Sequence, residues 1–328
     1  MLFDSTAPVT PPDAQVRAEA LAAVSASGLG RLRELGAWVA ACQGVFPPAP
    51  LQRCRVVVFA GDHGVVKRGM STLPPEYSVR QAAVIDSGAG AVNVLARAAG
   101  ASVRVVDVSL DQEGGPEQVR RGSGAVDVED AMSAEEFTAA VELGRRIADQ
   151  EVDSGADLLL PGDLGVGNTT VAAAVLGALT RTEPVAVVGP GAGMDDELWK
   201  IKVSAIRDAM FRVRNLGAEP EELLRKISSP DLVALVAFIA QAATRRTPVL
   251  LDGAPVTVAA FLAERLVPGT RQWCQAGQLS PEPAHLIALQ ALELTPLIAL
   301  DMNAGQGAGA LAALPLVTAA AELLADQA

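Results

Sequence analysis

A glycine-rich segment at 158–179, LLLPGDLGVGNTTVAAAVLGAL, contains the residues best suited to hold an anion. Its apolar start predicts a strand, Gly162, Gly165 and Gly167 predict a tight turn, and NTT at 168–170 predicts the start of a helix. Glycines let backbone N–H groups approach an anion, and a helix N-terminus adds its positive dipole end. No lysine stands in the Walker position, so this is not a nucleoside-triphosphate loop. The alternative is a glycine turn with an ordinary Asn/Thr helix cap.

Three further glycine-rich turns follow apolar runs, at 189–202, 251–255 and 303–310. Lys202, about two helical turns beyond the first of them, is placed either to reach a phosphate or to form a surface ion pair. Four such strand ends together favour one shared anion site. Gln306, in the last turn, is an amide that donates and accepts hydrogen bonds but takes no proton at neutral pH.

The two histidines, His63 and His285, are the remaining candidates for acid–base chemistry. His63 follows Asp62 at a strand end and is either a general base or a residue held in place by neighbouring backbone, and we favour the second interpretation. His285 follows SPEPA, which indicates helix capping and packing. No GxSxG or Cys/His arrangement supports a nucleophilic triad, and no cluster supports a metal site.

Strands alternating with helices must position these turns. Apolar runs without alternation predict strands buried on both faces; they lie at 55–64, 102–110, 156–165, 184–193, 248–255 and 296–305. Helical patterns between them predict right-handed βαβ units and a parallel sheet. Two helices are expected within 14–44, after a Pro-rich N-terminal arm. In such an α/β fold the ligand lies beyond the carboxyl ends of the strands, where the turns fall.

Composition limits the possible partners and the compartment. The 328 residues carry a net charge of -12, which repels phosphate backbones and argues against nucleic acid. Three cysteines in no paired spacing, an odd and sparse set, indicate reduced thiols in the cytoplasm. We read no signal peptide and no uncharged apolar run of membrane-spanning length, so no membrane partner is expected.

Several motifs in order resemble one enzyme family: VVVFAGDHGV, PPE, GDLGVGNTT, GPGAGMDD with Lys202, LLDG and WCQAGQLSPEPAHLIAL…LDMNAGQGAGALAALP. The chain is identified by these as similar to nicotinate-nucleotide–dimethylbenzimidazole phosphoribosyltransferases, with wording closest to actinobacterial members. The resemblance implies a parallel Rossmann-like sheet flanked by helices. It also implies a small helical lobe, with 1–50 as arm and lobe helices, 51–310 as the large α/β domain and 311–328 as a helix returning to the lobe.

The resemblance also implies the reaction and its partners. Family members transfer phosphoribose from nicotinate mononucleotide to 5,6-dimethylbenzimidazole, giving α-ribazole phosphate for cobalamin biosynthesis. They use no metal or organic cofactor and form homodimers. A carboxylate base removes the azole proton in that reaction.

The resemblance also implies the site residues, position by position within the matching motifs. The base lies in a GEGSGA-like loop in the family; the loop here reads GQGAGA, with Gln306 at the glutamate position. Asp163 and Lys202 match the other catalytic positions. The substrate-binding positions implied are Gly165, Gly167, Asn168, Thr169, Thr170, Gly191, Gly193, Gly253, Ser71, Arg80 and Gln81. Arg80 stands where the family has a base-contacting glutamine, and Gly277-Gln278 stands in place of its GH pair.

The departures leave three functions open. The first is an active transferase with the usual donor, in which Asp163 partly replaces the missing base. The second is an enzyme with an acceptor that needs no base, or with changed stereochemistry. The third is a catalytically impaired homologue that binds nicotinate mononucleotide or an α-riboside without turnover.

Overall fold

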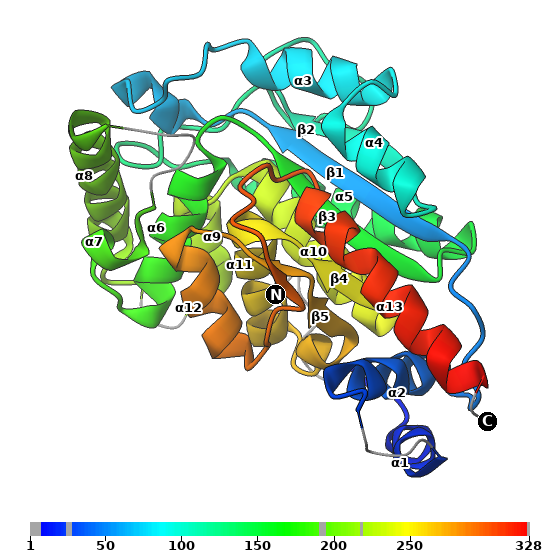
Figure 1. Cartoon of the computed structure of the whole chain (residues 1–328). Helices are drawn as coiled ribbons and strands as arrows, with labels where there is room; N and C mark the ends of the chain where they lie inside the picture. Colours follow the sequence, from blue (N-terminus) through cyan, green and yellow to red (C-terminus); the bar gives the residue numbers. More distant parts are fainter. Residues whose placement is uncertain (1–7, 24–27, 190–194, 217–218, 327–328) are drawn as a thin grey trace.

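A parallel sheet lies at the centre of the fold in the computed structural model, which describes residues 8–23, 28–189, 195–216 and 219–326 (Figure 1). Within these residues the sheet has five strands in the order β2-β1-β3-β4-β5, with bounds Cys54–Gly61 (β1), Ser102–Ser109 (β2), Leu158–Leu164 (β3), Val249–Leu251 (β4) and Cys274–Ala276 (β5). The order reverses between β1 and β3. In doubly wound sheets ligands bind at that reversal, beyond the carboxyl ends of the strands.

The inner strands β1, β3 and β4 are buried on both faces, as their continuous apolar runs predict, whereas the first half of the edge strand β2 is exposed or partly buried. On β1, Val57 and Phe59 belong to the core on one face, and Val56 and Val58 to the core on the other. Phe59 also packs edge-to-face on Phe238, with ring centroids 5.2 Å apart. The predicted α/β class with a parallel sheet is confirmed.

Helices cover both faces of the sheet (Figure 1). The larger core includes α5 (Ala134–Asp153), α6 (Asn168–Thr180), α8 (Asp196–Val213), α9 (Pro220–Ile227), α10 (Pro230–Thr244), α11 (Gly253–Leu266) and α12 (Pro283–Leu292). The second core includes α2 (Arg31–Gln43), α3 (Tyr77–Asp86), α4 (Ala91–Ala98) and α13 (Ala308–Asp326). The carboxyl edge of the sheet therefore lies between two helical layers.

Two of the predicted strands are wrong or much shorter. The run at 184–193 begins as a helix, α7 (Pro184–Val187), because a proline at the first helical position is already in helical geometry; residues 190–194 lie outside the described part of the chain. The run at 296–305 gives only β7 (Ile298–Ala299), which pairs with β6 (Gln278–Leu279) in a separate sheet. The sequence pattern did not predict β5, because its three residues are too few for a periodic signal.

The N- and C-terminal helices pack together. The two predicted N-terminal helices are α1 (Ala14–Ala23) and α2, and α13, red in Figure 1, reaches α2 from the sheet. A Cβ on Gly36 would lie 2.4 Å from the carbonyl oxygen of Ala320, so only glycine permits this contact. The arm is anchored at Val9, whose N–H donates to the Pro268 carbonyl oxygen at 2.7 Å.

Among the described helices, α13 is long and apolar enough to cross a membrane by length and composition alone. In the fold, 56% of that segment is buried, and its apolar side chains pack against α2 and the sheet. Packing in the core therefore accounts for its composition.

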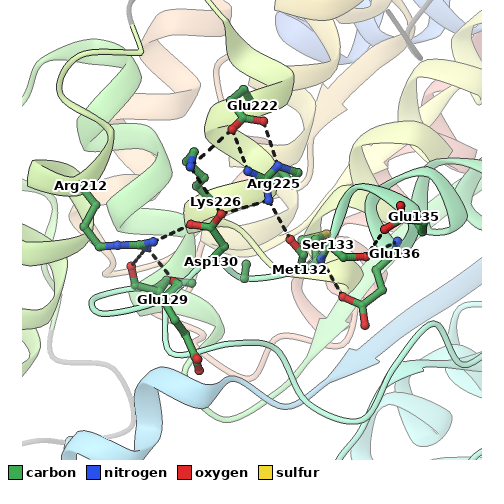
Figure 2. Close-up of polar contacts among 12 residues, drawn as sticks. Glu129, Asp130, Met132, Ser133, Glu135, Glu136, Arg212, Glu222, Arg225 and Lys226 are labelled. Carbon is green, nitrogen blue, oxygen red and sulfur yellow. Dashed lines mark hydrogen bonds and ion pairs between the residues drawn. The ribbon is translucent and has the colours of Figure 1, made fainter.

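An ionic cluster holds α8 and α9 to the loop that precedes α5 (Figure 2). Asp130 in that loop pairs with Arg212 of α8 at 2.6 Å. Arg225 and Lys226 of α9 pair with the same carboxylate at 3.0 and 3.4 Å. Arg212 also donates to two backbone carbonyls of the loop, both at 2.7 Å. These contacts fix the helix that carries Lys202.

Candidate active site

A cavity of about 340 Å³ opens at the carboxyl edge of the sheet. Its lining comes from the turn after the 3-10 helix η1 (Gly64–Arg68), α3, the first residue of α4, the end of β3 with the β3–α6 turn, the start of α11, the β6 segment and the loop before α13, with Lys202 from α8. It brings together most of the predicted site residues, namely Asp163, Lys202, Gln306, Gly165, Gly167, Asn168, Thr169, Thr170, Gly253, Ser71 and Gln81. Gly191 and Gly193 lie outside the described residues.

Arg80 is the predicted site residue that the structure keeps away from this cavity. Its side chain is 72% exposed and pairs with Glu76 at 2.8 Å. Successive residues of a helix point about 100° apart, so Gln81 lines the cavity while Arg80 faces away from it. The prediction that Arg80 contacts substrate is therefore not supported.

The turn between β3 and α6 is shaped by close backbone packing. A Cβ on Gly165 would lie 2.0 Å from the Gly61 carbonyl oxygen, and Gly167, with φ of 93°, would bring its Cβ to 2.7 Å from Val66. Both positions therefore require glycine. The turn delivers the N-terminus of α6, the positive end of its dipole, to the cavity wall.

Lys202 is buried beside that helix terminus. It is 2% exposed, and its Nζ donates to Oγ1 of Thr169 at 3.0 Å. Burial lowers the pKa of Lys202, opposed by the charge of Glu282. The first turn of α6 has no acidic residue. A buried ammonium beside a positive helix end favours an anion between them, and the surface-pair alternative for Lys202 is excluded.

His63 supports this turn from behind. Its Nδ1 lies 2.8 Å from the Val166 carbonyl oxygen and its Nε2 lies 3.3 Å from Oδ2 of Asp231. Burial lowers the pKa of His63, but Asp231 and the Val166 carbonyl outweigh it and the pKa is raised. With both nitrogens engaged and the ring outside the cavity lining, the interpretation of a held histidine is favoured over a general base.

His285 is also a packed residue. Its Nδ1 accepts from the backbone N–H of Ser280 at 3.1 Å and lies 2.9 Å from Oγ of that serine. Burial lowers its pKa to about 4, so the ring is neutral near pH 7. This fits the predicted packing role.

Asp163 is a buried carboxylate on the cavity wall, 3% exposed. Asn168 donates its side-chain amide to Oδ2, whereas Oδ1 is buried without a hydrogen-bond partner. Burial raises the pKa of Asp163 to about 7, with the charge of Asp252 acting in the same direction. The carboxyl group is thus poised to exchange a proton near neutral pH.

Gln306 lies beside Asp163 in a constrained turn. Its backbone N–H donates to the Asp163 carbonyl oxygen at 2.9 Å, and its φ is 62°, in the left-handed region. Gly305 and Gly307 also have positive φ, 62° and 80°. The amide is held at the cavity wall but supplies no base.

Two polar groups at this edge of the sheet were not identified from the sequence as site residues. Gln278 of β6 lines the cavity, and Asp252, which directly follows β4, is fully buried. Gln278 donates to Oδ1 of Asp252 at 2.8 Å. Burial raises the pKa of Asp252 to about 6, while the hydrogen bond from Gln278 lowers it. Their position could have identified them, because both residues belong to the edge of the sheet where the glycine turns lie.

Among the described residues, no group of three or more histidine, cysteine, aspartate or glutamate side chains is arranged to hold a metal ion. The polar groups that converge on the cavity are instead an ammonium, helix N-termini, hydroxyls, amides and one carboxylate. They suit an organic phosphate ligand.

Comparisons with known proteins agree with this geometry. A family model described as "Phosphoribosyltransferase" matches residues 9–328. The chain is 60% identical over 321 residues to a nicotinate-nucleotide–dimethylbenzimidazole phosphoribosyltransferase of Corynebacterium efficiens, covering 96% of this chain and 87% of the relative. It is 52% identical to the protein of the same name from Mycobacterium marinum, covering 98% and 93%. The crystal structure of CobT from Thermus thermophilus is similar at 37% identity with a TM-score of 0.89, covering 94% and 96%.

Proposed function

Since the chain belongs to the nicotinate-nucleotide–dimethylbenzimidazole phosphoribosyltransferase family, we propose that it transfers phosphoribose from nicotinate mononucleotide to 5,6-dimethylbenzimidazole or a related base. The product is α-ribazole phosphate, for cobalamin biosynthesis. Relatives that carry this enzyme name match over nearly the whole chain, and no comparison favours the impaired alternative.

The observation that carries the proposal is the buried Lys202 beside the N-terminus of α6. The 5′-phosphate of the nucleotide supplies the anion that these two positive groups need. Anchoring the phosphate there places the ribose over the carboxyl ends of the central strands, within the same cavity. Holding both substrates in one cavity also makes the transfer effectively unimolecular.

The chemical step needs a nucleophile and a proton acceptor. A ring nitrogen of the benzimidazole attacks C1′, and the C1′–N bond to nicotinate breaks with its electron pair leaving on nicotinate. The attacking azole then carries an extra positive charge, which it loses by giving up the proton on its other nitrogen. We assign that proton to Oδ1 of Asp163, because Asp163 is the only carboxylate among the described residues that line the cavity.

The decisive experiment is incubation of the full chain with nicotinate mononucleotide and dimethylbenzimidazole, followed by chromatography for nicotinate and α-ribazole phosphate. Both products should accumulate in equal amounts. Binding of the nucleotide in calorimetry with neither product would favour the impaired, binding-only function instead. Release of nicotinate without α-ribazole phosphate would indicate another acceptor.

Three further features are proposed from family membership. We expect a homodimer, with a two-fold interface tested by light scattering at micromolar concentration. We also expect a cytoplasmic enzyme without membrane or nucleic-acid partners. Residues 1–50 and 311–328 are proposed to act as a small lobe; Ala20, Ala37 and Leu324, from α1, α2 and α13, share a separate apolar cluster there.

A further inference from the structure

Gln278, on the cavity wall, has a buried hydrogen-bond acceptor without a partner. The residue is 1% exposed and lines the cavity wall. Its Nε2 donates to Oδ1 of Asp252 at 2.8 Å and to the carbonyl oxygen of Met302 at 3.2 Å. Its Oε1 is buried and has no partner. A buried acceptor without a donor is destabilising in the empty protein, so a bound donor is the natural partner.

The orientation of this amide is fixed by its neighbours. A primary amide has two N–H donors, and both are used here, by a carboxylate and a carbonyl that only accept. A flipped amide would direct Oε1 against those two oxygens. Oε1 must therefore face away from Asp252 and Met302. Asp252 is the positioning residue, because its carboxylate accepts and has no proton to donate.

The backbone also makes room for this pair. A Cβ on Gly309 would lie 2.2 Å from Cδ of Gln278 and 2.4 Å from Oδ1 of Asp252. Glycine at the start of α13 therefore allows both side chains to occupy this place.

The chemistry of the fixed oxygen selects its partner. An acceptor oxygen repels the phosphate and the carboxylate of nicotinate mononucleotide, so it needs an O–H or N–H group. The nucleotide offers the two hydroxyls of its ribose. The benzimidazole offers one N–H, which the proposed function gives to Asp163. The ribose hydroxyls are therefore the donors that remain for Oε1 of Gln278.

We propose that Oε1 of Gln278, held in one orientation by Asp252, accepts a hydrogen bond from a ribose hydroxyl of the bound nucleotide. The proposal rests on the proposed function for the identity of the nucleotide. It makes Gln278 a residue that distinguishes ribose from deoxyribose.

The test is calorimetric binding of nicotinate mononucleotide and of its 2′-deoxy and 3′-deoxy analogues to the full chain. The wild type should bind the ribonucleotide at least about tenfold more tightly than one of the analogues. Gln278→Met, similar in length but without an acceptor, should weaken ribonucleotide binding and reduce that preference to within about twofold. Asp252→Asn should also reduce the preference although Gln278 is intact, because the new amide can donate to a flipped Gln278.

Gln290→Met, at an exposed position on α12, is the matched control and should bind as the wild type does. Thermal melting of each variant establishes that it is folded. A Gln278→Met protein that keeps the wild-type preference overturns the proposal. So does an effect confined to the KM for dimethylbenzimidazole, which would assign the acceptor to the azole. If the wild type binds no nicotinate mononucleotide at all, the proposed function itself fails.

Discussion

Gly162 on β3 packs directly against the backbone of Gln306: a Cβ added to Gly162 would lie 2.4 Å from the carbonyl carbon of Gln306 and 2.6 Å from the nitrogen of Gly307. The loop before α13 therefore lies on the strand that carries Asp163, with no space for a side chain between them. This contact brings two distant segments into one cavity wall.

Gly162→Ala should displace this loop, because the nearest atoms are backbone and cannot rotate away. We expect a loss of about 1–3 kcal/mol in the free energy of unfolding and a fall in turnover. Urea unfolding and nicotinate release measure the two effects. Gly115→Ala is the control, since a Cβ there meets nothing within 4 Å. Equal behaviour of the two variants would show that the loop adapts freely.

Asp163→Asn should lower kcat by about 10²–10⁴-fold if the carboxylate accepts the azole proton. The acid limb of the wild-type pH–rate profile should have its midpoint near the pKa of about 7, and the variant should lack it. Adding Gln306→Glu to Asp163→Asn should restore part of the rate, because it supplies a carboxylate on the same wall. A variant with an unchanged profile would refute the assignment to Asp163.

Arg80→Gln should add nothing to that rescue. The cation is exposed and paired with Glu76, away from the cavity, so it cannot lower the pKa of a new carboxylate at position 306. The triple variant and the double variant should agree in kcat within about twofold. A clear gain from Arg80→Gln would mean that α3 approaches the cavity when substrate binds.

Lys202→Met should weaken binding of nicotinate mononucleotide by at least about tenfold, because a charge-assisted hydrogen bond to the phosphate is lost. Lys200→Met is the control on the same helix: that lysine pairs with Glu197 at 2.7 Å on the surface and should be neutral. Calorimetry compares the two. Equal affinities would place the phosphate elsewhere.

Asp163 should make a growing unfavourable contribution to the stability of the empty protein as pH rises from about 4 to 7. The folded pKa of Asp163 is about 7, above its unfolded value of about 3.9. Between those values the folded state binds more protons than the unfolded state, so ionisation disfavours the fold. Asp163→Asn should therefore be more stable than wild type at pH 7.5, by a few kcal/mol at most, at about 1.4 kcal/mol per pKa unit. The two should converge near pH 4; a constant difference would point to another cause.

Much of the fold was determined by local sequence. Short apolar runs predicted β1, β2 and β3, and the glycine turn before Asn168 predicted the N-terminus of α6, since these features depend on neighbouring residues. The run at 184–193 was wrongly predicted to be a strand, because a local apolar pattern does not distinguish strand from helix. Pro184 begins a helix there. The glycine turn of the anion site was predictable for the same reason as β3 and α6, whereas Lys202 comes to it from α8 through tertiary packing.

Only the tertiary structure decided which side chains share the cavity and in what state. That Gln81 faces inward while Arg80 faces solvent depends on how α3 is rotated against β1 and β2. The unpaired oxygens of Asp163 and Gln278, and the raised pKa of Asp163, depend on burial by segments far away in the chain. Sequence sets the chemical groups and local turns, whereas desolvation and long-range packing set their orientation and their affinity for protons.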